Sequence, residues 1–246
     1  MIFFVTGGSR GIGEAIVLDA LREGHDVAFT YRENRAAAER VLARAKDLAP
    51  GRRCLAYALD VRDSSAVESV ADRVLDDLGD VHVVVPNAGI AINALAVNMS
   101  DEDWREVLDT NLTGAFYVVR QFLPTLIANR FGRIVLVSSM GRGGVSGQAA
   151  YAASKAGLVG LGRTLAKEYG KRGITTNTIV PGFIETDMTV ERMSEDNRKF
   201  WLEYCPLERL GELSEVSKVV LFLASDGAGF INGHAIDITG GLEWAP

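Results

Sequence analysis

The stretch Thr6-Gly7-Gly8-Ser9-Arg10-Gly11-Ile12-Gly13 decides the fold of this chain. It follows an apolar run at residues 2–6, which is typical of a buried strand, and it opens a helical pattern at residues 11–23. A pyrophosphate needs close approach of the backbone and a helix N-terminus with free N–H groups, and glycines in this strand–turn–helix order allow both. The spacing is G-x-x-x-G-x-G rather than G-x-G-x-x-G. The segment therefore predicts a dinucleotide-binding turn made by Gly7, Ser9, Arg10, Gly11, Ile12 and Gly13.

Short apolar runs alternate with longer amphipathic stretches along the whole chain, which is the pattern of βα units. Most of the runs are continuously hydrophobic, as expected for parallel strands covered by helices on both faces. Strands are predicted at residues 2–6, 26–31, 53–59, 81–86, 132–138, 175–180 and 235–238. Helices are predicted at residues 11–23, 35–48, 64–78, 103–128, 151–171 and 214–224. Ser64 and Ser214 are the expected N-caps of two of these helices.

The pattern predicts an α/β fold with a single Rossmann-type domain over residues 1–246. Its core would be a doubly wound parallel sheet of about seven strands with helices on both faces. The longest segment without a regular pattern spans about residues 183–211. A long connection in a compact domain is more often functional than structural, so we expect a substrate lid there, with a purely structural excursion as the alternative.

Composition and charge exclude several classes of protein. Hydrophobic residues make up 48% of the chain and charged residues 24%, far from the composition of disordered proteins. A net charge of -6 argues against a nucleic-acid-binding protein, which normally carries a basic face. Cys54 and Cys205 lie far apart without a metal-ligand spacing, so neither a disulfide framework nor a metal site is expected. Without a long apolar run or a signal-peptide pattern, we expect no membrane segment and a cytoplasmic location.

The end of the second predicted strand bears on the choice of cofactor. Folds that bind NAD usually place an acidic residue there to hold the ribose hydroxyls. This chain has Arg32 just past the strand and Arg10 inside the glycine-rich turn. Guanidinium groups suit a 2′-phosphate, so the sequence favours NADP(H) over NAD. In the alternative interpretation Arg32 is a solvated charge, and Arg10 alone sets the preference.

Further motifs follow the glycine-rich turn in a fixed order. They are Asp60-Val61, Asn87-Ala88-Gly89, Asn111 in NLTGAF, Tyr151 and Lys155 in YAASK, and Pro181-Gly182 before Ile184 and Thr186. With these motifs the chain resembles the short-chain dehydrogenase/reductase family over nearly its whole length. The resemblance implies that the adenine is held by Asp60 and Val61. It implies that the rest of the cofactor is lined by Asn87, Ala88, Gly89, Tyr151, Lys155, Pro181, Gly182, Ile184 and Thr186.

Tyr151 and Lys155 stand four residues apart on a predicted helix, so both project from one face. An adjacent ammonium stabilises a phenolate and so lowers the pKa of the phenol. A tyrosine of this kind donates a proton to a carbonyl oxygen while a reduced nicotinamide delivers hydride to the carbon. Enoyl reductases of related fold have six residues between the tyrosine and the lysine. The shorter spacing here indicates reduction of C=O rather than C=C.

A serine upstream of Tyr151 is expected to hydrogen-bond the carbonyl oxygen of the substrate. Ser138 lies thirteen residues before Tyr151, the usual separation in the family, and is our prediction. Alignment from the start of the strand instead favours Ser139, with one residue missing from the loop. The choice between the two serines stays open. By the same resemblance, Asn111 supports a water that connects Lys155 to bulk solvent.

Within the family the chain resembles the 3-oxoacyl-(acyl-carrier-protein) reductases of fatty-acid and polyketide synthesis. This implies NADPH-dependent reduction of a 3-oxoacyl thioester, a homotetramer or related oligomer, and a docking site for the acidic carrier at Arg130 and Arg172. Helix-end cations favoured by the helix dipole are the alternative for these two arginines. The alternatives in function are an NAD(P)-dependent dehydrogenase of a small free alcohol and, more remotely, a non-catalytic cofactor-binding scaffold.

Overall fold

The computed structural model describes residues 1–185 and 195–242, in which strands and helices alternate. The strands are β1 (Ile2–Val5), β2 (Asp26–Tyr31), β3 (Cys54–Ala58), β4 (Val83–Val85), β5 (Gly132–Val137), β6 (Ile174–Pro181) and β7 (Ala235–Ile238). The α-helices are α1 (Gly11–Arg22), α2 (Arg35–Leu48), α3 (Ser64–Leu78), α4 (Asp101–Leu108), α5 (Gly114–Asn129), α6 (Ala149–Tyr169), α8 (Glu195–Tyr204) and α9 (Leu213–Ala224). The predicted strands are thereby confirmed, two of them to the residue.

The described strands form one seven-stranded sheet in the order β3-β2-β1-β4-β5-β6-β7, and all neighbouring pairs are parallel. This confirms the predicted doubly wound α/β fold. Successive strands are added toward one edge of the sheet from β1 to β3 and toward the other edge from β4 to β7, so the strand order reverses between β1 and β4. In open parallel sheets a ligand binds at such a reversal, in the crevice at the carboxyl ends of the strands.

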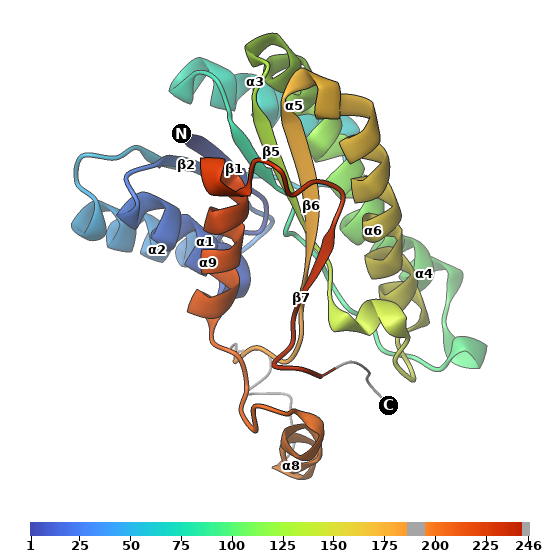
Figure 1. Cartoon of the computed structure of the whole chain (residues 1–246). Helices are drawn as coiled ribbons and strands as arrows, with labels where there is room; N and C mark the ends of the chain where they lie inside the picture. Colours follow the sequence, from blue (N-terminus) through green and yellow to red (C-terminus); the bar gives the residue numbers. More distant parts are fainter. Residues whose placement is uncertain (186–194, 243–246) are drawn as a thin grey trace.

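Helices cover both faces of the sheet, as the sequence predicts (Figure 1). α1, α2 and α9 lie on one face, and α3, α5 and α6 lie on the other. Successive side chains of β1 point to opposite faces of the sheet, so Phe3 packs into the buried cluster on one face and Phe4 into the cluster on the other. Burial of one such side chain stabilises the fold by about 1.5–3 kcal/mol. All residues of β4, β5 and β6 are buried, which explains the hydrophobic run of β4, although β6 also buries the polar stretch at residues 175–178.

Both predicted N-caps are wrong by one or two residues. The N-cap of α3 is Asp63, whose carboxylate accepts hydrogen bonds from the N–H groups of Ser65 (2.9 Å) and Ala66 (3.1 Å). Ser64 is therefore the first helical residue. At α9 the N-cap is Glu212, and its own N–H donates to the carboxylate of Glu215 at 2.8 Å. Ser214 lies inside the first turn.

The predicted helix at residues 103–128 is interrupted. α4 ends at Leu108, a π-helical turn spans Asp109–Thr113, and α5 begins at Gly114. The extra residue of a π-turn rotates the following side chains relative to a regular α-helix, and such turns are frequent at functional sites. Here the turn carries Asn111 into the interior, where it is 1% exposed.

The segment expected to be a lid contains α8, which lies beyond the carboxyl ends of β6 and β7 and apart from both helical layers (Figure 1). Its base is held by backbone hydrogen bonds, from Glu185 N–H to the Gly211 carbonyl (2.8 Å) and from Gly211 N–H to the Phe183 carbonyl (2.9 Å). The ring of Phe183 packs on that of Trp201, with centroids 4.0 Å apart. Among the described residues, no helix is long and apolar enough to cross a membrane.

Candidate active site

The glycine-rich turn between β1 and α1 has a backbone that only glycine accommodates. Gly7 and Gly11 have φ angles of 66° and 55°. A Cβ on Gly13 would lie 2.2 Å from the Gly7 carbonyl oxygen and 2.6 Å from Asn87 Nδ2. Within the described part of the chain, no side chain caps the first turn of α1, where Arg10 is the N-cap residue. The free N–H groups of that turn therefore suit a pyrophosphate.

Asn87 fastens this turn to the end of β4. Its Nδ2 donates hydrogen bonds to the carbonyls of Thr6 (2.9 Å) and Gly7 (3.2 Å). The backbone N–H groups of Asn87 and Ala88 both donate to Thr6 Oγ1 at 3.0 Å. Thr6 and Asn87 thus close the two sides of the crevice between β1 and β4. Thr6 belongs to the glycine-rich motif, but the sequence did not predict that its hydroxyl would bind the backbone of Asn87 and Ala88.

Charged groups gather where β2 and β3 end, on the side of the sheet that is predicted to hold the adenosine. Arg62 holds the carboxylate of Asp60 at 2.6 Å, and its hydrogen bond lowers the pKa of that carboxyl. Arg32 contacts the carboxylates of Glu33 (2.9 Å) and Glu106 (3.7 Å). Sequence reasoning did not predict Arg62 or Glu106, because their placement depends on the approach of α4 to this loop. Nearby, the buried Val61 packs so closely on Gly114 that a Cβ there would lie 2.7 Å from it.

Tyr151 and Lys155 lie near the start of α6, at the carboxyl ends of β5 and β6. Lys155 Nζ is buried, donates to the Val137 carbonyl (2.8 Å) and lies 5.7 Å from the centre of the Tyr151 ring. Burial lowers the pKa of Lys155 to about 8. Burial also raises the pKa of Tyr151, while a hydrogen bond with Ser139 acts in the opposite direction. The pKa of the phenol is therefore raised, and not lowered as expected, because the loss of solvent outweighs the hydrogen bond with Ser139.

The two candidate serines make different contacts. Ser138 is 3% exposed, and its hydroxyl donates to the backbone carbonyl of Lys155 at 2.8 Å. Ser139 hydrogen-bonds the Tyr151 hydroxyl, and its Oγ also accepts from the N–H of Gly141 at 3.2 Å. The Ser139 hydroxyl therefore lies on the side of the tyrosine, whereas the predicted Ser138 is engaged with the backbone of α6. Ser138 as the substrate-binding serine stays a prediction.

The side chain of Asn111 joins the π-turn to the loop after β4 and to α6. Its Oδ1 accepts from the N–H of Ile90 (2.8 Å), and its Nδ2 donates to the Ile90 carbonyl (2.9 Å) and to Ser154 Oγ (3.0 Å). Ser154 in turn donates to the Tyr151 carbonyl at 2.7 Å. The amide thereby fixes the first turn of the helix that carries the tyrosine.

Gly89 lies close to both Asn111 and Lys155. A Cβ at this glycine would lie 3.2 Å from Asn111 Oδ1 and 3.4 Å from Lys155 Nζ. Both polar atoms face the same small volume, so a water bound there would have a carbonyl-type acceptor and an ammonium donor beside it. The relay role expected for Asn111 stays a prediction.

The residues predicted to border the nicotinamide lie at the end of β6 and just after it. Pro181 is the last residue of β6. A Cβ on Gly182 would lie 3.0 Å from the Cα of Thr239, so the two backbones are in contact. Ile184 is buried. Thr186, the last predicted cofactor contact, lies outside the described residues.

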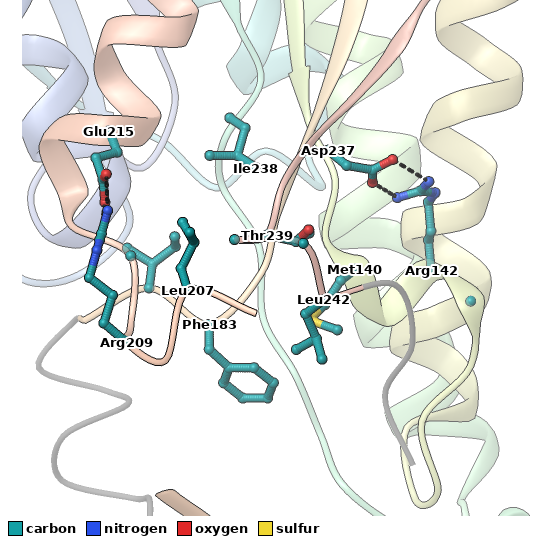
Figure 2. A pocket seen from close by; sticks show the side chains of 15 residues that line it. Met140, Arg142, Phe183, Leu207, Arg209, Glu215, Asp237, Ile238, Thr239 and Leu242 are labelled. Atoms are coloured by element: carbon teal, nitrogen blue, oxygen red, sulfur yellow. Dashed lines mark hydrogen bonds and ion pairs between the residues drawn. The ribbon is translucent and has the colours of Figure 1, made fainter. Parts of the chain in front are cut away.

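A cavity of about 710 Å³ lies among the loop after β5 and the residues that follow β6 and β7. Its described lining includes Met140, which follows Ser139 in the chain, but neither Tyr151 nor Lys155. Figure 2 shows an ion pair on either side of it, Arg142–Asp237 (2.7 Å) and Arg209–Glu215 (2.6 Å). The side chains between them are mostly apolar: Met140, Phe183, Leu207, Ile238 and Leu242. An apolar cavity with a few polar groups suits an acyl chain or another small organic substrate.

The basic residues expected at the mouth of the site lie elsewhere. Arg130 ends α5 just before β5, and its guanidinium donates to the Lys171 carbonyl at 3.4 Å. Arg172 belongs to the short turn after α6. Tyr151 stands in the first turn of α6, whose 21 residues span about 30 Å. The two arginines are therefore neighbours at the opposite end of the sheet from Tyr151 of the same chain.

The fold and this site can be compared with known proteins. The model of a family described as enoyl-(acyl carrier protein) reductase matches residues 7–243. The 3-oxoacyl-(acyl-carrier-protein) reductase FabG of Staphylococcus epidermidis is 41% identical over 239 residues, 97% of each chain. FabG of Escherichia coli is 40% identical over 245 residues, 98% of this chain and 96% of that protein. A crystal structure described as a short-chain alcohol dehydrogenase of Sinorhizobium meliloti has a TM-score of 0.93 and 35% identity, covering 98% of this chain and 95% of the other.

This chain belongs to the short-chain dehydrogenase/reductase family. Within the family it is similar over nearly its full length to proteins named 3-oxoacyl-(acyl-carrier-protein) reductase.

Proposed function

We propose that the chain is a reductase that uses NADPH to convert a 3-oxoacyl thioester, carried by acyl carrier protein, to the 3-hydroxyacyl form. The observation that carries this proposal is the grouping of Tyr151, Lys155 and Ser139 beside the crevice between β1 and β4. Full-length relatives named for this activity support the choice of substrate. The matching family description names an enoyl reductase, but the four-residue step from Tyr151 to Lys155 favours C=O chemistry.

Ser139, Tyr151 and Lys155 each have a different role in the proposed reaction. NADPH supplies the hydride that reaches the carbonyl carbon. Ser139 Oγ hydrogen-bonds the carbonyl oxygen and holds it against the Tyr151 hydroxyl. Tyr151 Oη donates its proton to that oxygen as negative charge develops. Lys155 then returns a proton to Tyr151, resupplied through the space beside Gly89 and Asn111.

We assign the substrate-binding serine to Ser139 in place of Ser138. The Ser139 hydroxyl faces the tyrosine that must share the carbonyl oxygen with it. The Ser138 hydroxyl is committed to the Lys155 carbonyl, behind the catalytic face of α6. Ser138 therefore orients the helix and does not contact the substrate.

The nucleotide contacts follow the crevice from end to end. The pyrophosphate lies on the N-terminus of α1, against Gly7, Ser9, Gly11, Ile12 and Gly13. Arg10, exposed on the turn, and Arg32 contact the 2′-phosphate. Asp60 and Val61 border the adenine, Asn87 to Gly89 line the middle of the crevice, and Tyr151 and Lys155 contact the nicotinamide ribose. Pro181, Gly182, Ile184 and Thr186 border the nicotinamide, and the segment at residues 183–211 acts as the lid.

The carrier docks on the basic pair Arg130 and Arg172. Since this pair lies about a full helix length from Tyr151 of its own chain, a carrier bound there delivers its substrate to another subunit. The function therefore needs an oligomer, for which we propose a homotetramer in the cytoplasm. Light scattering coupled to size-exclusion chromatography measures the assembly, and a monomeric active enzyme would contradict this part of the proposal.

A dehydrogenase of a small free alcohol is the second candidate. The solved structure described as a short-chain alcohol dehydrogenase, at 35% identity, favours it. The two candidates differ in the substrate that fills the cavity, since both use the same Tyr151 and Lys155 chemistry.

The deciding experiment follows NADPH consumption, with NADH alongside, on an acetoacetyl thioester of a pantetheine mimic and then of an acyl carrier protein. A crotonyl thioester serves as the control for C=C reduction. We expect turnover with NADPH that improves on the carrier, and none on the crotonyl compound. Activity confined to free ketones or alcohols would replace the proposed function by the second candidate.

A further inference from the structure

A cluster of five charged side chains lies at the adenosine side of the crevice, formed from three separate parts of the chain. Arg32 and Glu33 follow β2, Asp60 and Arg62 follow β3, and Glu106 reaches over from α4. We call these five residues the adenosine cluster. Each of their side chains stays partly exposed, between 35% and 78%, so each is within reach of a ligand.

Glu106 is the centre of this cluster. One carboxylate oxygen of Glu106 contacts both guanidinium groups, at 3.2 Å from Arg62 and 3.7 Å from Arg32. Arg62 also holds Asp60, through bonds of 2.6 and 3.0 Å from its guanidinium and 3.0 Å from its backbone N–H. The shorter contact of Arg32, at 2.9 Å, is with the carboxylate of the highly exposed Glu33. The carboxylate of Asp109 adds a further negative charge near Arg62.

The charges in this cluster do not cancel. Two guanidinium groups face the three carboxylates of Glu33, Asp60 and Glu106, which leaves an excess of one negative charge. NAD and NADP differ here only by the 2′-phosphate, whose charge of roughly -1.5 to -2 must enter this field. A 2′-phosphate that reaches Arg32 meets the Glu106 carboxylate, 3.7 Å from the same guanidinium group, and is repelled by its charge, whereas an uncharged ribose hydroxyl is not.

We propose that Glu106 and Arg62 are specificity-determining residues that set the preference between NADP and NAD with opposite signs. Glu106 competes with the 2′-phosphate for Arg32 and so weakens binding of NADP. Arg62 neutralises Glu106 and Asp60, which removes their repulsion and so strengthens binding of NADP. Both are positioning residues, because they act on the phosphate through Arg32 and the local field. This inference rests on the proposed nucleotide-binding function and deepens it.

The test measures the dissociation constants of NADP⁺ and NAD⁺ by calorimetry, without turnover. Glu106→Gln keeps the size of the side chain and removes its charge. We expect the affinity ratio of NADP⁺ to NAD⁺ to rise about threefold to fivefold, the size of one exposed ion pair. Arg62→Gln leaves two carboxylates uncovered, so we expect the ratio to fall by about fivefold or more, with Arg62→Lys restoring most of it. Both shifts should shrink at high ionic strength.

Asp101→Asn is the matched control, because it removes a carboxylate from the same helix α4. Asp101 is 82% exposed and contacts Arg105 at 3.6 Å, outside the adenosine cluster. Its affinity ratio should equal that of the wild type. Equal losses of both nucleotides in Glu106→Gln, or an unchanged ratio in both variants, would overturn the inference and leave the proposed function standing. A wild-type protein that binds neither nucleotide would overturn both.

Discussion

The Ser138 hydroxyl donates a hydrogen bond to the backbone carbonyl of Lys155, 2.8 Å away, across the interface between β5 and α6. The next residue, Ser139, turns its hydroxyl to Tyr151. Two adjacent serines therefore serve the same helix in different ways. One anchors the backbone beneath the lysine, and the other faces the reacting oxygen.

This division predicts different consequences for the two alanine substitutions. Ser139→Ala should lower kcat by roughly 10²-fold, the typical effect of losing one oxyanion contact, while its effect on stability is limited to the lost bond from the Gly141 N–H. Ser138→Ala removes a buried hydrogen bond to the Lys155 carbonyl, which keeps its helical partner within α6, and should cost about 0.5–1.5 kcal/mol of unfolding free energy. Steady-state kinetics and urea unfolding of both variants check the pair. A stable but inactive Ser138→Ala, beside a fully active Ser139→Ala, would reverse our assignment.

Tyr151→Phe removes the proton donor and keeps the ring. We expect kcat to fall by about 10²–10⁴-fold, the usual contribution of a positioned general acid. Binding of NADPH, measured by calorimetry, should change little, because Tyr151 makes only one of the many proposed nucleotide contacts. Tyr169→Phe on the same helix is the control, since Tyr169 ends α6 far from the site. Unchanged turnover in Tyr151→Phe would refute the catalytic role.

Lys155 predicts a specific dependence of stability on pH. Its pKa of about 8 in the folded protein lies below its ordinary value of 10.5, so the unfolded chain binds more protons between these two values. The stability contribution of Lys155 must therefore rise with pH from about 8 to 10.5, at up to about 1.4 kcal/mol per pH unit. Below pH 8 the full cost of burying the charge remains.

The measurement compares urea unfolding of the wild type and Lys155→Met across this pH range. The comparison is needed because other groups act in the opposite direction. Burial raises the pKa of Cys54 to about 12, so its thiol keeps its proton in the folded state and costs stability as pH rises. A difference between the two proteins that stays flat with pH would show that Lys155 is not desolvated.

Gly13→Ala should disrupt the nucleotide-binding turn. The added Cβ would lie within 2.2 Å of the Gly7 carbonyl and 2.6 Å of Asn87 Nδ2, which forces both to move. We expect binding of NADP⁺ to weaken by at least about 10-fold, since the turn must approach the pyrophosphate closely. Gly160→Ala in α6 is the control, because the described structure has no atom within 4 Å of its Cβ position. That variant should bind normally and gain about 0.5–1 kcal/mol of stability. Normal binding by Gly13→Ala would contradict the assigned turn.

Much of the fold could be predicted because its signals are local and repeated. The strands at residues 26–31 and 235–238 and the helices at 35–48 and 64–78 were predicted to the residue. Burial on both faces makes most of the strands largely apolar, and the amphipathic helices between them have clear ends. The N-caps were missed because Asp63 and Glu212 compete with adjacent serines, and only side-chain geometry separates such neighbours.

The features that escaped prediction depend on contacts between distant parts of the chain. The π-turn at Asp109–Thr113 carries an amide whose partners, Ile90 and Ser154, lie far from it in sequence. No periodicity of residues 103–128 reveals that requirement. The choice between Ser138 and Ser139 depends on the length of one loop, and the contact of Arg62 with Glu106 depends on how α4 packs. Sequence motifs located the site but did not determine which neighbouring side chain faces it.

The hydrogen bonds of Ser154 and Ser138 to the backbone of α6 have a consequence for the timing of catalysis. They hold the turn between Tyr151 and Lys155 from both of its sides, one through the π-turn and the other through β5. Ordering this turn therefore takes place when the protein folds, and little conformational entropy remains to be lost when the substrate arrives. The acid and the lysine are in register before either ligand binds, so the backbone amides of this turn should exchange with deuterium only on global unfolding.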